Sequence, residues 1–237
     1  MNEPAPKENW VRAYREAPEI FDAFSRAEDP GGLVARRLRS LAPMANRRVL
    51  ELGCGTGRYL RELAPCAQLY LGVEPSLNML ALARPAAFGI PGRPLLLRGR
   101  GESLPFKTGT FGMVFAAWVL VNLREEVRAR VLKEASRILD PAGAGTWILE
   151  NHWDSQFQRY RGRGAEDEAR LCRLMDQDGF HLVETVDTEL RFPSPSEAER
   201  VLGYLCGDTM LEHLRRAPAA VLEHRIAILH RPVDAGS

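Results

Sequence analysis

The chain has 237 residues, of which 45% are hydrophobic and 27% are charged, so it is long enough to bury a core within one domain. Its net charge of +1 gives no general attraction to nucleic acids or anionic lipids, and its four cysteines show neither C-x-x-C pairs nor histidines at zinc spacing. We therefore expect no disulfide framework and no metal site. The first residues lack a basic and apolar leader, and no apolar run reaches roughly 18 residues, so we expect a cytoplasmic protein that does not cross a membrane.

Helices are predicted for the first 45 residues. Four aromatic residues recur there at helical spacing: Trp10, Tyr14, Phe21 and Phe24. Pro18 interrupts the pattern, which predicts two short helices, and a third is predicted over residues 33–41 after a Pro-Gly-Gly breaker. Tyr14 joins an apolar ring to a hydroxyl group and is a candidate for contacting a ligand and acting in catalysis, although packing on the rest of the fold explains these rings equally well.

The stretch RRVLELGCGTGRYLR, residues 47–61, organises the rest of the chain. Its apolar run over residues 49–52 is short and predicts a buried strand, and a helix is expected to begin at Tyr59. Between them lie glycines at alternate positions: Gly53, Gly55 and Gly57. Because glycine has no Cβ, the backbone of this turn can take positive φ and a ligand can approach it closely. The sixth position of a dinucleotide fingerprint, which requires glycine, is Arg58 here.

A second strand is predicted over residues 69–74 and ends at Glu74. A carboxylate just beyond the carboxyl end of such a strand can accept hydrogen bonds from both hydroxyls of a ribose. The alternative is that Glu74 caps the next helix, residues 77–83, although Ser76 suits that role better.

With these residues in place, ELGCGTG followed by GVEP resembles the class I S-adenosylmethionine-dependent methyltransferases, of the small-molecule, methyltransferase 11-like type. Three further segments follow in the family's order: GESLPF at 101–106, FGMVFAAWVL at 111–120, and LKEASRILDPAGAGTWILEN at 132–151. The resemblance covers roughly residues 49–151.

The resemblance implies an α/β, Rossmann-like, doubly wound fold with a seven-stranded mixed sheet whose last strand is antiparallel. It divides one methyltransferase domain, 1–237, into an N-terminal helical cap (1–45), a cofactor-binding core (46–153), and an acceptor-side part with a loop, a helical insert and a closing hairpin (154–237). It implies S-adenosyl-L-methionine as cofactor. The implied contacts are Glu51, Gly53, Cys54, Gly55, Gly57, Glu74, Pro75, Met79, Gly101, Glu102, Ala117 and Trp118.

Two positions need separate treatment. Arg100 stands where the family commonly has an aspartate that accepts a hydrogen bond from adenine. Arginine has donors only, so adenine must be held by main-chain groups near Gly101 and Glu102, or by stacking.

The sequence after residue 116 lacks the N-P-P-Y signature of enzymes that methylate exocyclic base nitrogens. Trp118 is expected to wall the acceptor pocket. Asn122 either contacts a ligand or begins a helix.

A helix is predicted over residues 124–139 and a fifth strand over 146–150. His152 follows this strand on the ligand-binding side of a parallel sheet, which makes it the candidate general base. The alternative is a loop histidine without a role. QRYRGRG, residues 158–164, is expected to be a basic loop before a helix near 166–177. Its arginines either clamp an anionic acceptor or a nucleic-acid backbone, or belong to a mobile, solvated loop.

The remaining sequence predicts a closing hairpin, with a helical insert between its strands and a frayed end at 233–237. The apolar face of the insert is expected to roof the acceptor pocket: Val201, Leu202, Leu205, Met210 and Leu214. We expect an enzyme that methylates N or O of a small molecule, as a monomer or homodimer. The alternatives are an RNA- or tRNA-directed methyltransferase and a non-catalytic regulatory protein that retains the cofactor fold.

Overall fold

The computed structural model describes residues 6–92 and 94–233, which surround a central β-sheet. The described part forms one seven-stranded sheet in the order β3-β2-β1-β4-β5-β7-β6. The last strand, β7, runs antiparallel to both of its neighbours, β5 and β6, as predicted. The strands are β1 (Arg48–Leu52), β2 (Leu69–Glu74), β3 (Leu95–Arg98), β4 (Met113–Ala117), β5 (Thr146–Asn151), β6 (His181–Arg191) and β7 (Val221–Arg231).

Helices connect these strands and cover both faces of the sheet. They are α1 (Pro6–Glu16), α2 (Pro18–Ala27), α3 (Leu33–Leu41), α4 (Leu60–Leu63), α5 (Leu77–Phe88), α6 (Glu125–Ile138), α7 (Gln156–Arg161), α8 (Gly164–Asp176), α9 (Pro195–Cys206) and α10 (Asp208–Arg216), with short 3-10 turns η1 (Ala64–Cys66) and η2 (Leu120–Asn122). The predicted breaks at Pro18 and after residue 32 are confirmed. Helix α5 is longer than predicted, because it continues through Pro85.

The predicted basic loop over residues 158–164 is wrong, since most of it is helix α7. The Ser155 side chain accepts a hydrogen bond from the backbone N–H of Gln158 at 3.3 Å and caps the start of the helix. Gly162, with φ of +68°, ends it in the left-handed conformation that favours glycine. These two capping residues were visible in the sequence and are the signal that could have predicted the helix.

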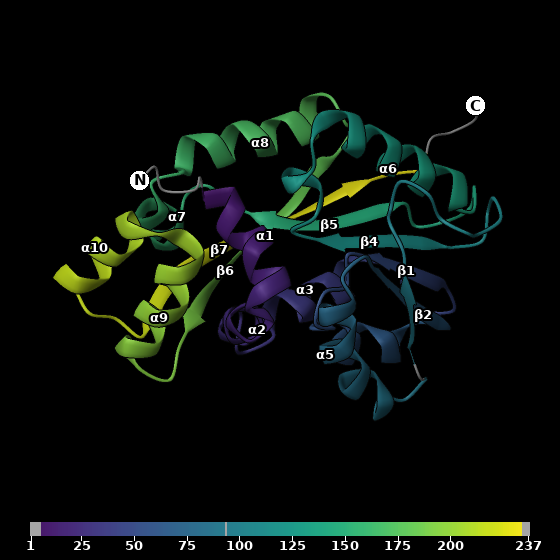
Figure 1. Ribbon diagram of the computed structural model, residues 1–237. Coiled ribbons are helices and arrows are strands. Elements are labelled where there is room, and N and C mark those ends of the chain that lie inside the picture. Colours follow the sequence, from purple (N-terminus) through teal and green to yellow (C-terminus); the bar gives the residue numbers. More distant parts are fainter. Residues whose placement is uncertain (1–5, 93, 234–237) are drawn as a thin grey trace.

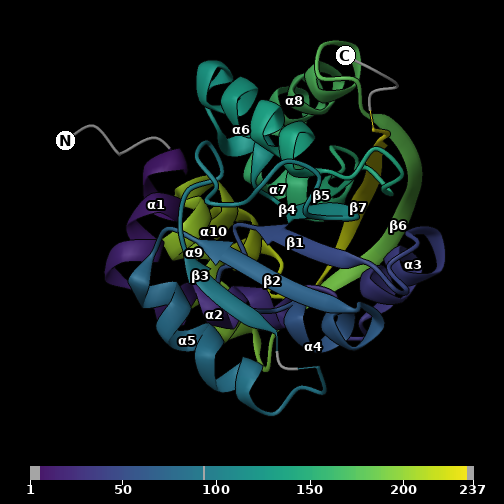
Figure 2. The same ribbon diagram turned by 90° about the vertical axis from the view of Figure 1, so that its right-hand side faces the viewer.

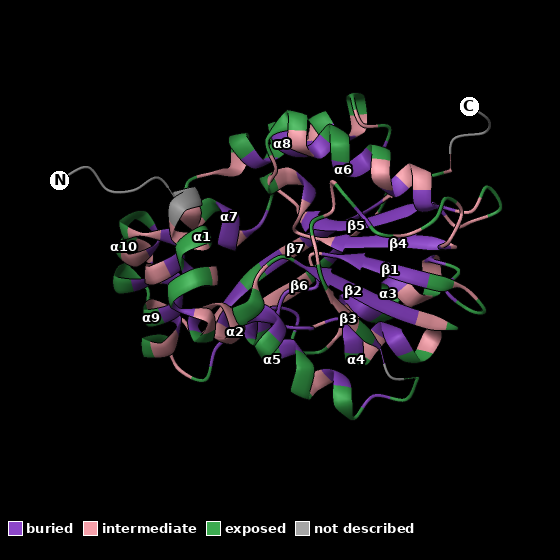
Figure 3. Cartoon of the chain, turned by 45° about the vertical axis from the view of Figure 1, so that its right-hand side comes forward, coloured by how far each residue is buried: buried purple, intermediate pink, exposed green. Residues whose placement is uncertain are grey.

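Alternating strand residues separate two cores, one on each face of the sheet. Val49, Met113 and Phe115 pack with helices α3, α4 and α5 on one face. Leu50, Leu52 and the strand residues beside them pack with α6 and α8 on the other. Figures 1 and 2 show these helices on opposite sides of the sheet, and Figure 3 shows that the central strands are almost wholly buried. This period-2 pattern holds every strand in register.

The β6–β7 hairpin extends beyond the carboxyl end of β5, since β7 residues 221–225 pair with β6 and not with β5. Helix α2 is joined to this extension, where the Thr188 hydroxyl donates to Asp29 at 2.8 Å. The same Asp29 carboxylate accepts from the backbone N–H groups of Leu33 and Val34, so it also caps α3. The hairpin thus fixes the N-terminal helices beside the carboxyl ends of the strands.

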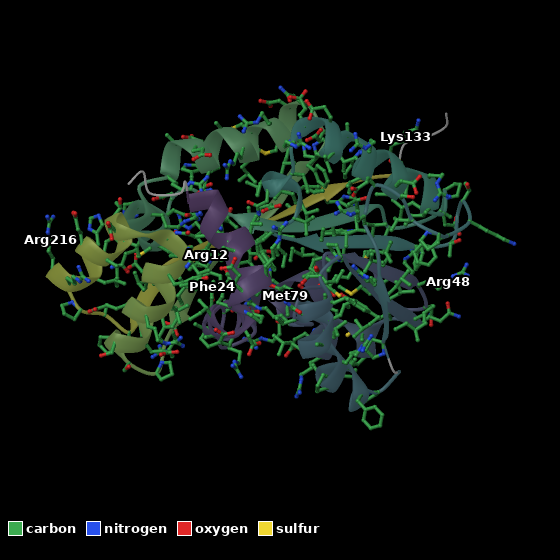
Figure 4. All side chains as sticks on the ribbon, viewed as in Figure 1. Arg12, Phe24, Arg48, Met79, Lys133 and Arg216 are labelled. Carbon is green, nitrogen blue, oxygen red and sulfur yellow. The ribbon has the colours of Figure 1, made fainter. Side chains whose placement is uncertain are left out.

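The helical insert, α9 and α10, forms a third core with α1, α2 and Phe157. Figure 4 shows Arg216 of α10 and Arg48, at the start of β1, at opposite ends of the molecule. The expectation that the insert roofs the acceptor pocket is wrong for its apolar face: the residues there are fully buried against α1 and α2, and none of them lines the cavity described below. The face therefore supports the helices that cover the cavity.

Candidate functional site

A cavity of about 840 Å³ lies at the carboxyl ends of β1, β2, β4 and β5. From β1 the chain adds strands on one side, β2 and β3, and then on the other, β4 and β5, so the cavity lies at the point where open α/β sheets bind ligands. Its volume is near the top of the range for small-molecule sites, about 300–1,000 Å³. Helices α1 and α2 cover it, contributing Trp10, Tyr14, Phe21, Phe24 and Glu28.

The glycine turn after β1 exposes its backbone to this cavity. Gly53 and Gly55 have φ of +67° and +55°, and both line the cavity. A Cβ on Gly53 would lie 2.7 Å from a methyl carbon of Val119, whereas the nearest atom to a Cβ on Gly55 is a Phe21 ring carbon at 3.9 Å. Gly53 is therefore required by packing, while the space beside Gly55 belongs to the cavity.

Gly57 does not contact the cavity, contrary to the expectation that it binds the cofactor. A Cβ there would lie 2.7 Å from Leu60 and 3.2 Å from Ala83 of α5. The residue allows α4 and α5 to pack closely beneath the turn. It supports the site only through the fold.

Glu74 lies opposite the glycine turn and holds it in place. One carboxylate oxygen accepts from the backbone N–H of Gly55 at 3.1 Å, and the other accepts from that of Ser76 at 2.9 Å. Burial raises the pKa of Glu74, although these two hydrogen bonds oppose the shift. Each oxygen keeps a lone pair for a ligand. The carboxylate can thus brace the turn and accept ribose hydroxyls at once.

Glu51, at the end of β1, is buried at the floor of the cavity beside Cys54. Burial raises the pKa of Glu51 to about 8, against a hydrogen bond from the Tyr70 hydroxyl at 3.0 Å and with the nearby charge of Glu74 adding to the shift. Glu51 is therefore largely protonated at neutral pH and can donate one hydrogen bond as well as accept others.

The β2 and β3 end of the cavity is lined by Pro75, Leu77 and Asn78 and by residues 98–102, which include Gly101 and Glu102. Arg100 pairs with Glu102 at 3.6 Å and is largely exposed. Met79 is fully buried and does not line the cavity, so the expectation that it packs on adenine is wrong. It points into the protein because the helix begins at Leu77 and turns this position away; Figure 4 labels Met79 on α5.

Trp118 and Ala117 both line the cavity. The indole N–H of Trp118 donates to the Asn151 side-chain oxygen at 2.8 Å, and Asn122 donates to the Trp118 carbonyl at 2.7 Å. Trp118 has φ of +55°, a conformation rare for a bulky residue. These bonds hold the ring in place, so the wall is rigid.

Arg58, Glu28 and His224 form a buried ionic network that sequence reasoning missed. Arg58 pairs with the Glu28 carboxylate, which also bonds His224 at 2.9 Å. Burial raises the pKa of Glu28, but Arg58 and the hydrogen bond from His224 outweigh it and hold the pKa below its ordinary value. The Arg58 guanidinium also lies 5.2 Å from the ring centre of Trp118. The network joins α2, the glycine turn and β7, which are far apart in sequence.

Three arginines from α7, α8 and the segment between them line the other end of the cavity: Arg161, Arg163 and Arg170. Their side chains are 7%, 10% and 9% exposed, so they are not part of a solvated loop. Arg159, on the same helix, is 57% exposed and points away from the cavity. The mobile-loop reading of this segment is wrong, because helix α7 covers most of it and the side chains of Arg161 and Arg163 are almost fully buried.

Glu150, in β5, also lines this end and was not singled out from the sequence. One carboxylate oxygen accepts from the Val121 backbone N–H at 3.3 Å; the other, Oε2, is buried without a hydrogen-bond partner in the described chain. Burial raises the pKa of Glu150 to about 8, with the backbone hydrogen bond opposing the shift. A carboxyl group that titrates near neutrality in a cavity is a candidate acid or base.

The two residues expected to act in catalysis have different surroundings. His152 stacks on Trp153 at 3.9 Å and is not among the described residues that line the cavity. Burial and the charge of Arg225 lower its pKa. Its expected position facing the acceptor is therefore wrong.

Tyr14 does line the cavity, packed on Phe21 at 4.5 Å between ring centres. Burial and then the charges of Glu74 and Glu28 raise its pKa, so it remains a neutral donor.

Within residues 6–92 and 94–233, no three histidine, cysteine or acidic side chains come together as metal ligands. The cysteines Cys54, Cys66, Cys172 and Cys206 are free. None of the helices described is both long and apolar enough for a membrane span.

Residues 49–143 match a family described as a methyltransferase domain. The chain is 27% identical over 136 residues to an uncharacterised methyltransferase of Geobacillus kaustophilus, covering 57% of this chain and 61% of that protein. It is 35% identical over 109 residues to a ubiquinone/menaquinone biosynthesis C-methyltransferase of Syntrophotalea carbinolica, covering 45% of each. The chain thus spans about half the length of these relatives.

The fold is similar to solved methyltransferase structures over almost the whole chain. Magnesium protoporphyrin IX methyltransferase from Synechocystis PCC 6803, solved with bound SAM, superposes with a TM-score of 0.56 at 16% identity, covering 98% of this chain and all of that one. A methyltransferase described as putative from Bacillus halodurans gives a TM-score of 0.55 at 15% identity, with 85% and 100% covered. At these identities the likeness concerns the fold.

Proposed function

We propose that this chain, in which residues 49–143 match a methyltransferase domain, is a class I S-adenosylmethionine-dependent methyltransferase that methylates an oxygen or nitrogen atom of a small molecule. The observation that carries the proposal is the glycine turn at Gly53 and Gly55, open to a cavity and faced by Glu74. The cofactor site so proposed consists of this turn, Glu51, Cys54, Pro75, Gly101, Glu102, Ala117 and Trp118.

These residues fit the cofactor's chemistry. The space beside Gly55 admits a ligand against the backbone, and the Glu74 carboxylate can accept ribose hydroxyls. The buried Tyr59 hydroxyl, which also lines the cavity, has no hydrogen-bond partner within the described residues and is available to a polar ligand. Adenine would lie against Leu77 and the main chain of residues 99–102, since Arg100 offers no acceptor.

When bound, S-adenosylmethionine supplies a methyl group that its sulfonium already activates. The chain's contribution is then mainly to place the acceptor in line, which Trp118 and the covering helices can do. Such alignment is worth roughly 7 to 11 kcal/mol, against about 3 to 5 kcal/mol for a general base that gives 10² to 10⁴ in rate.

Glu150 is the proposed proton acceptor in place of His152. Its Oε2 atom is buried at the acceptor end of the cavity and is not engaged by another described residue. When ionised, Oε2 would take the proton that the acceptor atom loses as the methyl group passes to it; the methyl carbon–sulfur bond of the cofactor would break in the same step and leave S-adenosylhomocysteine. Tyr14 is proposed to orient ligands as a hydrogen-bond donor, because its raised pKa keeps the hydroxyl protonated.

A small acceptor is favoured over a nucleic acid by the direction of the basic side chains. The arginines of the α7–α8 segment that line the cavity are almost fully buried, whereas recognition of a nucleic-acid backbone needs cations at the surface. A relative that is a tRNA U34 carboxymethyltransferase of Methylococcus capsulatus, 33% identical over 118 residues, keeps tRNA as the second candidate acceptor.

Calorimetry with S-adenosylmethionine and S-adenosylhomocysteine tests the proposal. Both should bind one molecule per chain, and NAD should not bind. A screen for transfer of a tritiated methyl group to metabolite and tRNA pools would then identify the acceptor class. Failure of both cofactor forms to bind a folded sample would refute the function, while binding without transfer to either pool would favour a regulatory protein.

Replacing Glu74 by alanine should weaken S-adenosylhomocysteine binding by about 1 to 3 kcal/mol, because ribose hydroxyls would lose their acceptor inside a largely buried site. Glu74→Gln should have an intermediate effect, since its amide oxygen can still accept. Calorimetry at pH 7 measures both. An unchanged dissociation constant for the folded alanine variant would remove Glu74 from the cofactor site.

A further inference from the structure

The arginine-lined end of the cavity points to the chemical class of the acceptor. We propose that the methyl acceptor carries an anionic group, a carboxylate or a phosphate, that is bound by Arg161, Arg163 and Arg170. This inference rests on the proposed function and specifies the substrate of the same site. The three side chains line the same cavity as the glycine turn, and the charge of Arg170 acts on Glu150, the proposed proton acceptor.

The local fold brings these arginines together. Arg161 is the last residue of α7, and Gly162, in its left-handed conformation, reverses the chain so that α8 starts at Gly164. Arg163 and Arg170 are seven residues apart, which is about two helical turns and places them on one side of α8. Three guanidinium groups from separate turns thus converge on one end of the cavity.

The cations at this end outnumber the anions. Asp167, which also lines the cavity, pairs with Arg161 at 3.5 Å and with Arg170 at 3.6 Å. Glu166, half exposed, pairs with Arg163 at 2.8 Å and also with Arg170. Glu150 adds little negative charge at neutral pH, because burial keeps it largely protonated. Three almost fully buried guanidinium groups therefore share two carboxylates, of which only that of Asp167 is similarly buried.

Two buried side chains at this end, those of Arg170 and Gln158, bear on whether an anion is needed there. Burial and the neighbouring charge of Arg163 lower the pKa of Arg170. Gln158 is fully buried beside them; its side-chain oxygen accepts from Arg161 at 2.6 Å, and its Nε2 donor has no hydrogen-bond partner within the described residues. Gln158 itself does not line the cavity, so an anion there would serve the guanidinium donors that do: its two or three oxygens supply several acceptors at once.

The other walls at this end describe the rest of the acceptor. Trp10 lies 6.0 Å from the Arg161 guanidinium and 5.0 Å from Phe24, and Val121 lies beside Glu150. The side chains of Trp10, Phe24 and Val121 all line the cavity. The site therefore suits a small molecule with an apolar, ring-sized body and one anionic group, whose nucleophilic atom faces Glu150.

Binding of simple probes to the protein saturated with S-adenosylhomocysteine tests this inference. Benzoate and phenyl phosphate provide the two anions, and benzamide is the neutral analogue of the same shape. At constant ionic strength, tryptophan fluorescence should report a dissociation constant for at least one anion that is tenfold or more below that of benzamide. The preferred anion identifies the group as a carboxylate or a phosphate.

Arg161→Gln and Arg170→Gln should each reduce this preference about tenfold or more. Arg159→Gln is the matched control, because Arg159 lies on the same helix as Arg161 but outside the cavity. It should retain the full preference. Arg161→Lys retains the charge without the bidentate geometry, so its preference for the anion should lie between those of the parent and Arg161→Gln. This variant guards against a fold defect in the glutamine variants.

Two results would overturn the inference: equal affinity for benzamide and both anions, or an anion preference that survives in both folded cavity variants. Loss of S-adenosylhomocysteine binding in the parent would instead refute the proposed function, so the two failures are distinguishable. Tight, salt-sensitive binding of tRNA that the Arg159→Gln variant loses and the cavity variants keep would also reject a small anionic acceptor.

Discussion

Gly55→Val is expected to abolish binding of S-adenosylmethionine and S-adenosylhomocysteine. The valine side chain would project into the space beside the turn, where the nearest atom to a Cβ is a Phe21 ring carbon at 3.9 Å. A β-branched residue at φ of +55° would also strain the turn, at a cost of about 1 to 3 kcal/mol. Calorimetry should find the affinity at least a hundredfold weaker than in the parent.

Gly109→Val separates the effect of filling the proposed site from the effect of straining the backbone. Gly109 has φ of +68°, and a Cβ there would meet nothing within 4 Å. It lies outside the cavity, so this variant carries a similar backbone strain without filling the proposed site. We expect lowered thermal stability and unchanged cofactor affinity. Similar losses of affinity in both variants, or normal binding by Gly55→Val, would show that the turn does not cradle the ligand.

Glu150→Gln is expected to slow methyl transfer by about 10² to 10⁴ when the acceptor must lose a proton. In the parent, turnover should rise with pH up to about 8, because Glu150 accepts a proton only when ionised and its pKa is raised to about 8. The glutamine variant should lose this rise while binding the cofactor normally. Steady-state kinetics between pH 6 and 9, with the acceptor identified in the screen, measures both.

His152→Ala is the comparison variant, since His152 lies beside the same strand but outside the cavity, and it should retain most turnover. If Glu150→Gln retained parental turnover across this pH range while His152→Ala lost it, the two assignments would have to be exchanged.

Stability provides a test of Glu150 that needs no substrate. In the unfolded chain a glutamate releases its proton near pH 4.3, whereas in the folded protein Glu150 holds it to about 8. The folded state thus binds more protons between these values, so the free energy of unfolding falls as pH rises through this window. Glu51, with the same raised pKa, contributes in the same direction. Glu150→Gln should therefore remove part of the pH dependence of the melting temperature.

The sequence predicted the fold through the resemblance of its motifs to a known family, and it predicted the individual strands and the proposed cofactor end through local patterns. Short continuous apolar runs predicted the strands, since a strand buried on both faces is apolar along its length. The glycines at 53 and 55 identified an open turn, because no other residue takes positive φ there without strain. Glu74 was found because a strand's last residue lies at the sheet edge whatever the rest of the chain does. The capping signals at Ser155 and Gly162 were equally local and were overlooked.

The acceptor end was decided by tertiary structure, because it joins residues that are distant in sequence. Nothing in residues 158–164 shows that Arg161 turns inward while Arg159 turns outward; the packing of α7 against β7 and α10 does that. His152 follows the carboxyl end of a strand, a position from which a base can face a ligand. Its backbone N–H, however, bonds β7 and its ring stacks on Trp153. Glu28, Arg58 and His224 come from three distant segments, and Glu150 gains its raised pKa from burial under a helix pair. Burial and charge pairing are properties of the assembled chain, so only the structure could assign these roles.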